Sequence, residues 1–260
     1  MNSKVERRKS LRRFAWLIGV GSLLYILYTA VRARILVGNT HALFRVAERF
    51  SRDYWVGDPK NCLLTLVVMG DSTALGQGAS GVETTIAHQL AQAMARKGLY
   101  VHVVNLAASG SLLSQVLSRQ APQLARLNPD LAILCIGAND TTHCTDLRAY
   151  RRDLASLLSQ VDATGATLLI ASTPDMYQSP AVPWPLAWAT GWRARLQDDV
   201  VGPELAGHRA QYVDLYNDGK LVSRDDPALY ASDLFHPSDK GYALWAQLFI
   251  AAANRARRQS

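Results

Sequence analysis

Two short polar segments, far apart in the chain, carry the side chains that nucleophilic catalysis needs. Gly-Asp-Ser at 70–72 follows an apolar run, and Asp-Leu-Phe-His-Pro at 233–237 precedes the last periodic apolar segment. A serine hydroxyl becomes a nucleophile when a base removes its proton, and histidine is a base suited to neutral pH. We therefore predict Ser72 as the nucleophile, His236 as its base and Asp233 as the acid that orients the imidazole. Taken alone, the first segment would equally suit an ordinary turn.

Two more positions, each after an apolar run, can supply hydrogen-bond donors for an oxyanion. Gly110 ends "NLAASG" at 105–110, and Asn139 lies in "GAND" at 137–140. The backbone N–H groups of Ser72 and Gly110 and the side-chain amide of Asn139 would make a set of three donors. Removal of one such donor typically costs about 3–4 kcal/mol of transition-state stabilisation. We predict that these three residues form an oxyanion hole.

Apolar runs and helical stretches alternate along the chain, which is typical of α/β proteins. Five runs rich in Val, Leu and Ile resemble strands buried on both faces, at 63–69, 100–106, 131–137, 166–172 and 210–216. Helical periodicity occupies 83–97, 111–127, 146–163, about 185–206 and 238–256. Right-handed crossovers between such strands predict a three-layer α/β/α fold with a five-stranded parallel sheet. The polar residues that follow the strands would then meet at one edge of that sheet.

The four polar blocks, in this order, resemble the SGNH hydrolases, also called the GDSL esterase/lipase family. The matching segments are "GDSTALG" at 70–76, "NLAASG" at 105–110, "GAND" at 137–140 and "DLFHP" at 233–237. The first block has Thr73 where the family name has leucine, and the third has Ala138 where many members have glycine. Neither difference removes a catalytic group.

The resemblance covers about residues 63–250 and implies a flavodoxin-like fold for a domain at 61–260. It also implies a serine esterase that acts on acyl or acetyl esters, with the roles predicted above. An O-acyltransferase that uses the same triad on a cell-envelope sugar is an alternative. A non-catalytic binding module is a further alternative, although such a module is expected to lack at least one catalytic residue. A lipid, a short-chain ester or an acetylated glycan would each fit as substrate.

The N-terminus combines basic residues with an apolar segment. Residues 1–34 hold eight of the 28 Lys and Arg residues and one of the 21 acidic residues, so the remaining body is neutral. We therefore expect no nucleic-acid partner. Residues 14–31 contain no ionisable group over eighteen positions, about the minimum for a transmembrane helix. A cleaved signal sequence is the alternative, but Val-Arg-Ala at 31–33 is a poor cleavage site.

The charge distribution predicts the orientation of this segment. Six basic residues precede it, and two follow it closely. The positive-inside rule places residues 1–13 in the cytoplasm and the catalytic domain on the other side of the membrane, as a single-pass protein. The domain would be secreted if the segment were cleaved. Residues 32–60 are expected to be a connector, in which 36–60 form a helix that packs on the domain or lies on the membrane.

Three tryptophans recur at helical spacing in the segment that follows the fourth predicted strand. Trp184, Trp188 and Trp192 would lie on one helix face. They can pack that helix onto the body, form an apolar wall for the substrate or contact the membrane.

We expect neither a metal nor another cofactor. Gly70, Gly76 and Gly78 do not make a GxGxxG motif, and no metal-ligand spacing occurs. The three cysteines are too few for a disulfide framework.

Overall fold

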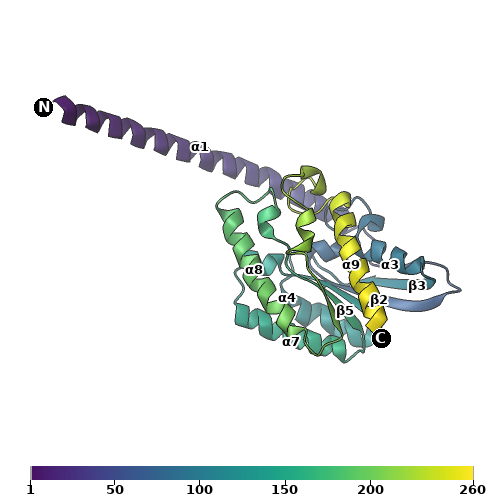
Figure 1. Cartoon of the computed structure of the whole chain (residues 1–260). Coiled ribbons are helices and arrows are strands. Elements are labelled where there is room, and N and C mark those ends of the chain that lie inside the picture. Colours follow the sequence, from purple (N-terminus) through teal and green to yellow (C-terminus); the bar gives the residue numbers. More distant parts are fainter. Residues whose placement is uncertain (1, 260) are drawn as a thin grey trace.

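A central β-sheet between two layers of helices forms the body of the protein (Figure 1). The structure is a computed structural model that describes residues 2–259, so the predicted segments that begin at 1 or end at 260 each have one terminal residue outside it. The sheet order is β1-β3-β2-β4-β5-β6. The strands are β1 (Asp53–Val56), β2 (Cys62–Gly70), β3 (Leu99–Asn105), β4 (Leu131–Cys135), β5 (Thr167–Ala171) and β6 (Ala210–Val213).

The prediction of a five-stranded, all-parallel sheet is wrong, because a sixth strand pairs antiparallel at one edge. This strand, β1, pairs with β3 in a register that sets Asp53 against Val104 and Val56 against Val101. It belongs to the segment expected to be a connector, where four residues without a long apolar run give no strand pattern. The five predicted strands are all present and parallel, and their order corresponds to the flavodoxin-like arrangement.

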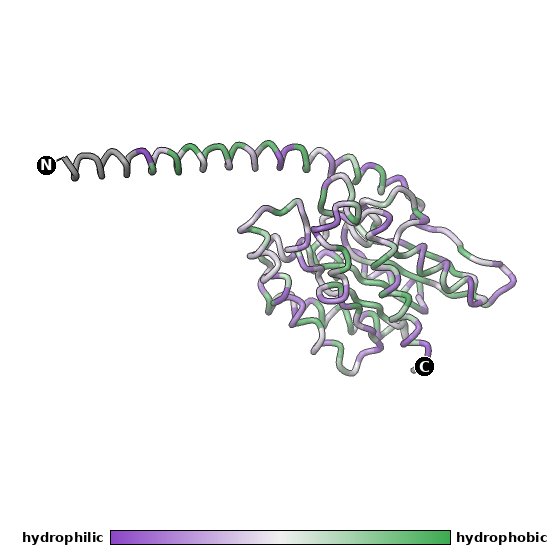
Figure 2. The backbone as a smooth tube through the Cα atoms, turned by 45° about the horizontal axis from the view of Figure 1, so that its top comes forward, coloured by the Kyte–Doolittle hydropathy of each residue, from purple (hydrophilic) through white to green (hydrophobic). Residues whose placement is uncertain are grey.

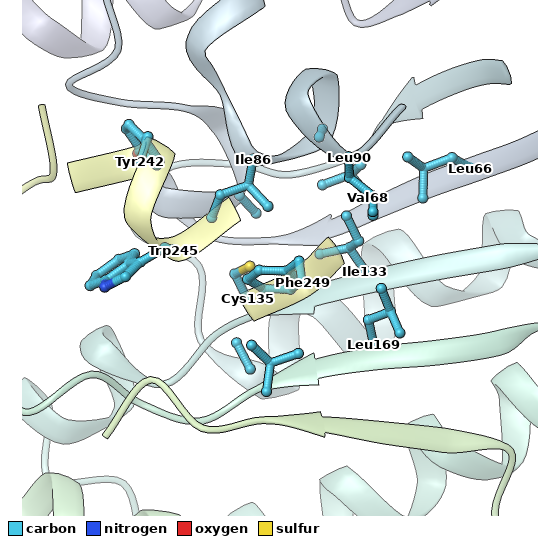
Figure 3. Close-up of a cluster of buried hydrophobic side chains, with 14 of the residues drawn as sticks. Leu66, Val68, Ile86, Leu90, Ile133, Cys135, Leu169, Tyr242, Trp245 and Phe249 are labelled. Carbon is cyan, nitrogen blue, oxygen red and sulfur yellow. The ribbon is translucent and has the colours of Figure 1, made fainter. Parts of the chain in front are cut away.

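Alternation of side chains along the buried strands builds a core on each face of the sheet. Leu66 and Val68 of β2 point to the face covered by α3 (Ile86–Ala95) and α9 (Asp239–Gln259). Figure 3 shows this cluster, with Phe249 of α9 lying against the strands. Val67 and Met69 point to the opposite face, which is covered by α7 (Leu147–Asp162). Both faces are therefore closed by helices, as the pattern predicts for a parallel sheet.

The remaining helices flank this core. They are α4 (Leu113–Gln115), η2 (Val116–Gln120), η3 (Ala121–Gln123), α5 (Leu124–Leu127), α6 (Ala138–Thr142) and α8 (Leu186–Glu204), and the short turns α2 (Ser72–Leu75), η1 (Val82–Thr84), η4 (Met176–Gln178), η5 (Asp218–Leu221) and η6 (Pro227–Leu229). Of these, α8 packs against α7 at the side of the molecule.

The longest helix, α1 (Asn2–Ala47), projects from the body as a single rod (Figure 1). Its segment Trp16–Ala47 is long and apolar enough to be a candidate membrane span, and Figure 2 shows the hydrophobic colouring along it. The end of the helix is different, because Ala47 is buried and Phe44 and Phe50 pack against the core. Of the two expectations for residues 36–60, packing on the domain therefore describes this end of the helix.

Candidate active site

A sharp turn at the end of β2 presents Ser72. Gly70 has φ +137°, and a Cβ atom there would lie 1.9 Å from the carbonyl oxygen of Cys135, so no side chain fits. The Asp71 carboxylate then accepts a hydrogen bond from the backbone N–H of Thr73 and caps α2. Ser72 is the first residue of this short helix. The turn and the candidate nucleophile are thus one structural unit.

A chain of two hydrogen bonds joins the three predicted triad residues. The Nε2 atom of His236 lies 2.9 Å from the Oγ atom of Ser72, and its Nδ1 atom lies 2.6 Å from Oδ2 of Asp233. All three side chains are buried, and Asp233 is 0% exposed. In this arrangement the imidazole can accept the serine proton at Nε2 while the carboxylate fixes the Nδ1 proton.

The loop that holds Asp233 and His236 keeps the carboxylate ionised. Burial alone would raise the pKa of Asp233, but the hydrogen bonds and charge of His236 and the backbone N–H of Phe235 lower it below the ordinary value. Leu234 between them has φ +56°, an uncommon conformation for a residue with a side chain. Its carbonyl oxygen accepts hydrogen bonds from the hydroxyl of Ser179 and the N–H of Ala181. These contacts hold the backbone in this conformation.

Two of the predicted oxyanion donors have free N–H groups. Within residues 2–259, the N–H groups of Ser72 and Gly110 have no hydrogen-bond acceptor. Gly110 is exposed at a turn with φ +80° after β3. Both N–H groups are therefore available to an added oxygen atom.

The third predicted donor, Asn139, is held by two acceptors. Its Nδ2 atom lies 3.1 Å from the carbonyl oxygen of Ser111 and 3.3 Å from Oδ2 of Asp71. Burial raises the pKa of Asp71 to about 6, although its bond from Thr73 works in the opposite direction. Asn139 can turn one N–H toward an oxyanion only by giving up one of these bonds.

A pocket opens beside His236. Its lining is mostly apolar and includes Ala138, Met176, Leu215, Val222, Phe235 and Trp245. The pocket has a volume of about 40 Å³ and Ser72 is not part of its lining, so it offers room for a small apolar group rather than for an acyl chain.

Comparison with known proteins identifies the family of this chain. A family model described as the GDSL-like Lipase/Acylhydrolase family matches residues 68–244, which include all five predicted site residues. This chain belongs to the GDSL-like lipase/acylhydrolase family.

Similar proteins extend the comparison. A curated relative of this GDSL-like chain, GDSL-like esterase Rv1075c from Mycobacterium tuberculosis, is 31% identical over 201 residues. That match covers 74% of this chain and 62% of the relative, so the chain spans less than two thirds of the relative's length. The crystal structure of TesA has a TM-score of 0.61 at 21% identity and covers 74% of this chain and 99% of that one. The psychrotrophic esterase EstA from Pseudoalteromonas sp. has a TM-score of 0.60 at 16% identity, covering 75% and 98%. At these identities the two structures show a shared fold.

The three tryptophans lie on the outside of this GDSL-like domain. Trp184, Trp188 and Trp192 are 70%, 65% and 57% exposed, and none of them lines the pocket beside His236. They therefore do not pack α8 onto the body, which was one of the three expectations for them. The helix instead uses an adjacent face, where Ala187, Gly191 and Ala194 are buried. The prediction that all three tryptophans share one helix face is wrong for Trp184, because α8 begins at Leu186.

Two residues at the site of this GDSL-like protein carry no signal in the sequence. The hydroxyl of Thr40, from α1, lies 3.1 Å from Oδ2 of Asp233. Gln77 is completely buried behind α2 and donates a hydrogen bond to the carbonyl oxygen of Thr40. Neither residue belongs to a motif, and only the three-dimensional fold brings position 40 to position 233.

Proposed function

We propose that this chain is a serine esterase that hydrolyses carboxylic esters through Ser72, His236 and Asp233. The observation that carries the proposal is the continuous hydrogen-bonded chain from Ser72 Oγ through His236 to the Asp233 carboxylate, at 2.9 Å and 2.6 Å. Membership of the GDSL-like lipase/acylhydrolase family supports the same reaction. The esterase name of the Mycobacterium tuberculosis relative supports it as well.

The first half of the reaction forms an acyl-enzyme. Ser72 Oγ attacks the carbonyl carbon of the ester while His236 Nε2 takes its proton, and the negative charge develops on the former carbonyl oxygen. The N–H groups of Ser72 and Gly110 and the amide of Asn139 bind this oxygen. The C–O bond to the alcohol then breaks, and His236 returns the proton to the departing alcohol.

The second half releases the acid. His236 takes a proton from water, the resulting hydroxide attacks the acyl carbon, and Ser72 leaves with the proton that His236 returns. The apolar pocket beside His236 would receive a group of about the size of an acetyl, because its volume is about 40 Å³. A sugar hydroxyl in place of water would give acyl transfer, and product analysis with an added polyol distinguishes the two.

The proposal places this reaction at a membrane, with α1 as an uncleaved anchor and the catalytic domain outside the cytoplasm. The support is the candidate span at Trp16–Ala47 together with the basic residues that precede it. Two contacts tie the span to the loop before α8. The hydroxyl of Tyr25 donates to the carbonyl oxygen of Trp184 at 2.8 Å, and Arg32 donates to the carbonyl oxygen of Pro180.

The exposed tryptophans then belong to the membrane-contacting surface rather than to the substrate pocket. Trp184 lies beside the apolar part of α1, just before α8 begins, and Trp188 and Trp192 are exposed on the first turns of α8. Tryptophan is enriched where protein meets the headgroup layer of a bilayer, because its ring is apolar and its N–H is polar. We expect this surface to lie against the lipid headgroups.

The decisive experiment measures hydrolysis by the purified full-length chain on a panel of p-nitrophenyl esters of increasing acyl length and on an acetylated sugar. A serine-directed phosphonate should label Ser72, and Ser72→Ala should abolish both labelling and turnover. Ser118→Ala is the matched control, because Ser118 is exposed and its hydroxyl bonds only to the carbonyl oxygen of Gln115, three residues earlier. Turnover that persists in Ser72→Ala would exclude the proposed mechanism.

A further inference from the structure

The projecting helix α1 passes directly over the loop that carries the triad acid. Asn39 donates to the carbonyl oxygen of Ser232 at 2.6 Å, and the next residue, Thr40, reaches the carboxylate of Asp233. In Figure 1 the end of α1 lies across the top of the body, next to the segment that precedes α9. The apolar helix segment Trp16–Ala47 therefore includes, near its domain end, a residue that contacts the triad.

The contacts of Asp233 show what Thr40 adds. Oδ1 accepts from the backbone N–H groups of Phe235 and His236, each at 3.0 Å. Oδ2 accepts from His236 Nδ1 at 2.6 Å and from the hydroxyl of Thr40 at 3.1 Å. In the part of the chain that the structure describes, Thr40 is the one donor to this carboxylate from outside the loop 233–236. It bonds to the same oxygen that orients the imidazole.

The hydroxyl of Thr40 has one proton and two possible acceptors. The carbonyl oxygen of Leu36, one helical turn earlier, lies 2.9 Å from Oγ1, and Asp233 Oδ2 lies 3.1 Å away. An ionised carboxylate is the stronger acceptor, because hydrogen bonds to charged groups are about twice as strong as neutral ones. The lowered pKa of Asp233, in which the bonds from His236 outweigh its burial, keeps it ionised at neutral pH. The proton therefore points to Asp233.

The backbone of Thr40 is also tied to the oxyanion side of the site. Its carbonyl oxygen accepts from Gln77 Nε2 at 3.1 Å, and Gln77 Oε1 accepts from the hydroxyl of Ser109 at 2.9 Å. Ser109 immediately precedes Gly110. One residue of α1 thus connects to both sides of the catalytic centre, with its side chain toward the acid and its main chain toward the oxyanion turn.

We propose that Thr40 is a positioning residue, through which α1 fixes the Asp233 carboxylate in the orientation that serves His236. This inference rests on the proposed esterase mechanism and extends the working site to a helix outside the segment matched by the family model. Asp233 Oδ2 has two donors that hold it from different directions. Without Thr40, His236 Nδ1 would be the one remaining donor to Oδ2 among residues 2–259, and the two backbone N–H groups on Oδ1 would alone oppose movement of the carboxylate with the imidazole.

The test compares Thr40→Val and Thr40→Ser in the full-length chain, in detergent or reconstituted in vesicles. Valine has nearly the same shape as threonine but donates no hydrogen bond, whereas serine keeps the hydroxyl. We expect kcat for a soluble ester to fall about tenfold in Thr40→Val, which corresponds to a loss of about 1.4 kcal/mol of transition-state stabilisation. KM should be unchanged, and Thr40→Ser should recover most of kcat.

Thr29→Val is the matched control. Thr29 lies on the same helix, and its hydroxyl bonds only to the carbonyl oxygen of Ile26. This variant should keep full kcat. Thr40→Ser and Thr29→Val should unfold at the wild-type denaturant midpoint, and kcat is compared under conditions in which every variant is folded. Full kcat in Thr40→Val, or a loss that serine does not restore, would overturn the inference. The same assay is run on Ser72→Ala to separate the two proposals. If Ser72→Ala is inactive, a negative result for Thr40 overturns only the role of Thr40 and leaves the esterase proposal standing. If Ser72→Ala is active, the esterase proposal itself is contradicted.

Discussion

The side-chain amide of Asn139 donates to the carboxylate of Asp71 at 3.3 Å, although the two residues follow different strands. Asp71 immediately precedes the candidate nucleophile, and Asn139 is the candidate oxyanion donor with a side-chain amide. The bond therefore links the serine turn after β2 to the turn after β4. It also places an almost fully buried carboxyl group directly behind the reacting residues.

Asp71 should make folding stability depend on pH. Burial raises its pKa from 3.8 to about 6, so the folded state holds this proton more tightly than the unfolded state does. The resulting stabilisation is complete below about pH 4 and is lost as the pH rises through about 6. A difference of about two pKa units corresponds to on the order of 3 kcal/mol.

The measurement is urea unfolding of wild type and Asp71→Asn between pH 4 and pH 8. The free energy of unfolding of wild type should fall relative to the variant over this range, and any pH-independent cost of the substitution cancels in the comparison. Asp225→Asn, at an exposed position, should run parallel to wild type. Parallel curves for Asp71→Asn would mean that this carboxyl group has an ordinary pKa.

Asn139→Ala should lower kcat by about 10²–10³-fold while KM changes little. The physical reason is that the amide binds the oxyanion, which exists in the transition state but not in the bound ester. Steady-state kinetics on a soluble ester provide the measurement. Because Asn139 also bonds to Asp71, the unfolding midpoint must be recorded in parallel. A kcat within threefold of wild type would remove Asn139 from the oxyanion hole.

Gly110→Ala and Gly98→Ala form a matched pair. Both glycines have φ +80°, and a Cβ atom at either position has nothing within 4 Å. Each substitution should therefore destabilise the fold by about 1–2 kcal/mol from backbone strain alone. Only Gly110→Ala should also lower kcat/KM, by more than about tenfold, because the new methyl group stands beside the oxyanion. Equal activity in the two variants would contradict a catalytic position for Gly110.

Replacement of Trp184, Trp188 and Trp192 by serine should reduce contact with lipid but leave hydrolysis of a soluble ester unchanged. The full-length chain is reconstituted in vesicles that contain phospholipids with brominated acyl chains near the headgroup, which quench nearby tryptophan fluorescence. Wild type should lose more fluorescence than the triple variant. Trp55→Ser is the control, because Trp55 is exposed on β1 at the edge of the sheet. Equal quenching of wild type and the triple variant would exclude the membrane-contacting surface.

Local patterns explain why much of this site could be predicted from the sequence. Ser72 follows a strand, and Asp233 and His236 lie three residues apart in one loop, so the alternation of strands and helices places them at one sheet edge. The strand β1 could not be predicted, because its four residues form a strand only by pairing with β3. The spacing of the tryptophans correctly placed Trp188 and Trp192 on one helix, but it did not show that Trp184 precedes α8 or that the three side chains are exposed.

The contact between Thr40 and Asp233 could not be predicted from the sequence either, because it joins residues 193 positions apart and Thr40 belongs to no motif. A threonine in a helix ordinarily bonds to its own helix, as Thr29 does. The direction in which α1 leaves the body determines which hydrogen-bond acceptor lies next to the hydroxyl of Thr40. That direction depends on the packing of Phe44, Ala47 and Phe50 against the core.

The short antiparallel strand β1 also has a consequence for solubility. It covers the outer edge of β3, a seven-residue strand that includes Val101, Val103 and Val104. An uncovered strand of this composition offers a row of unpaired backbone groups to another molecule and invites aggregation. A chain shortened to residue 61, the predicted start of the domain, would expose that row. Recombinant fragments that begin before Asp53 should therefore remain monomeric where shorter ones precipitate.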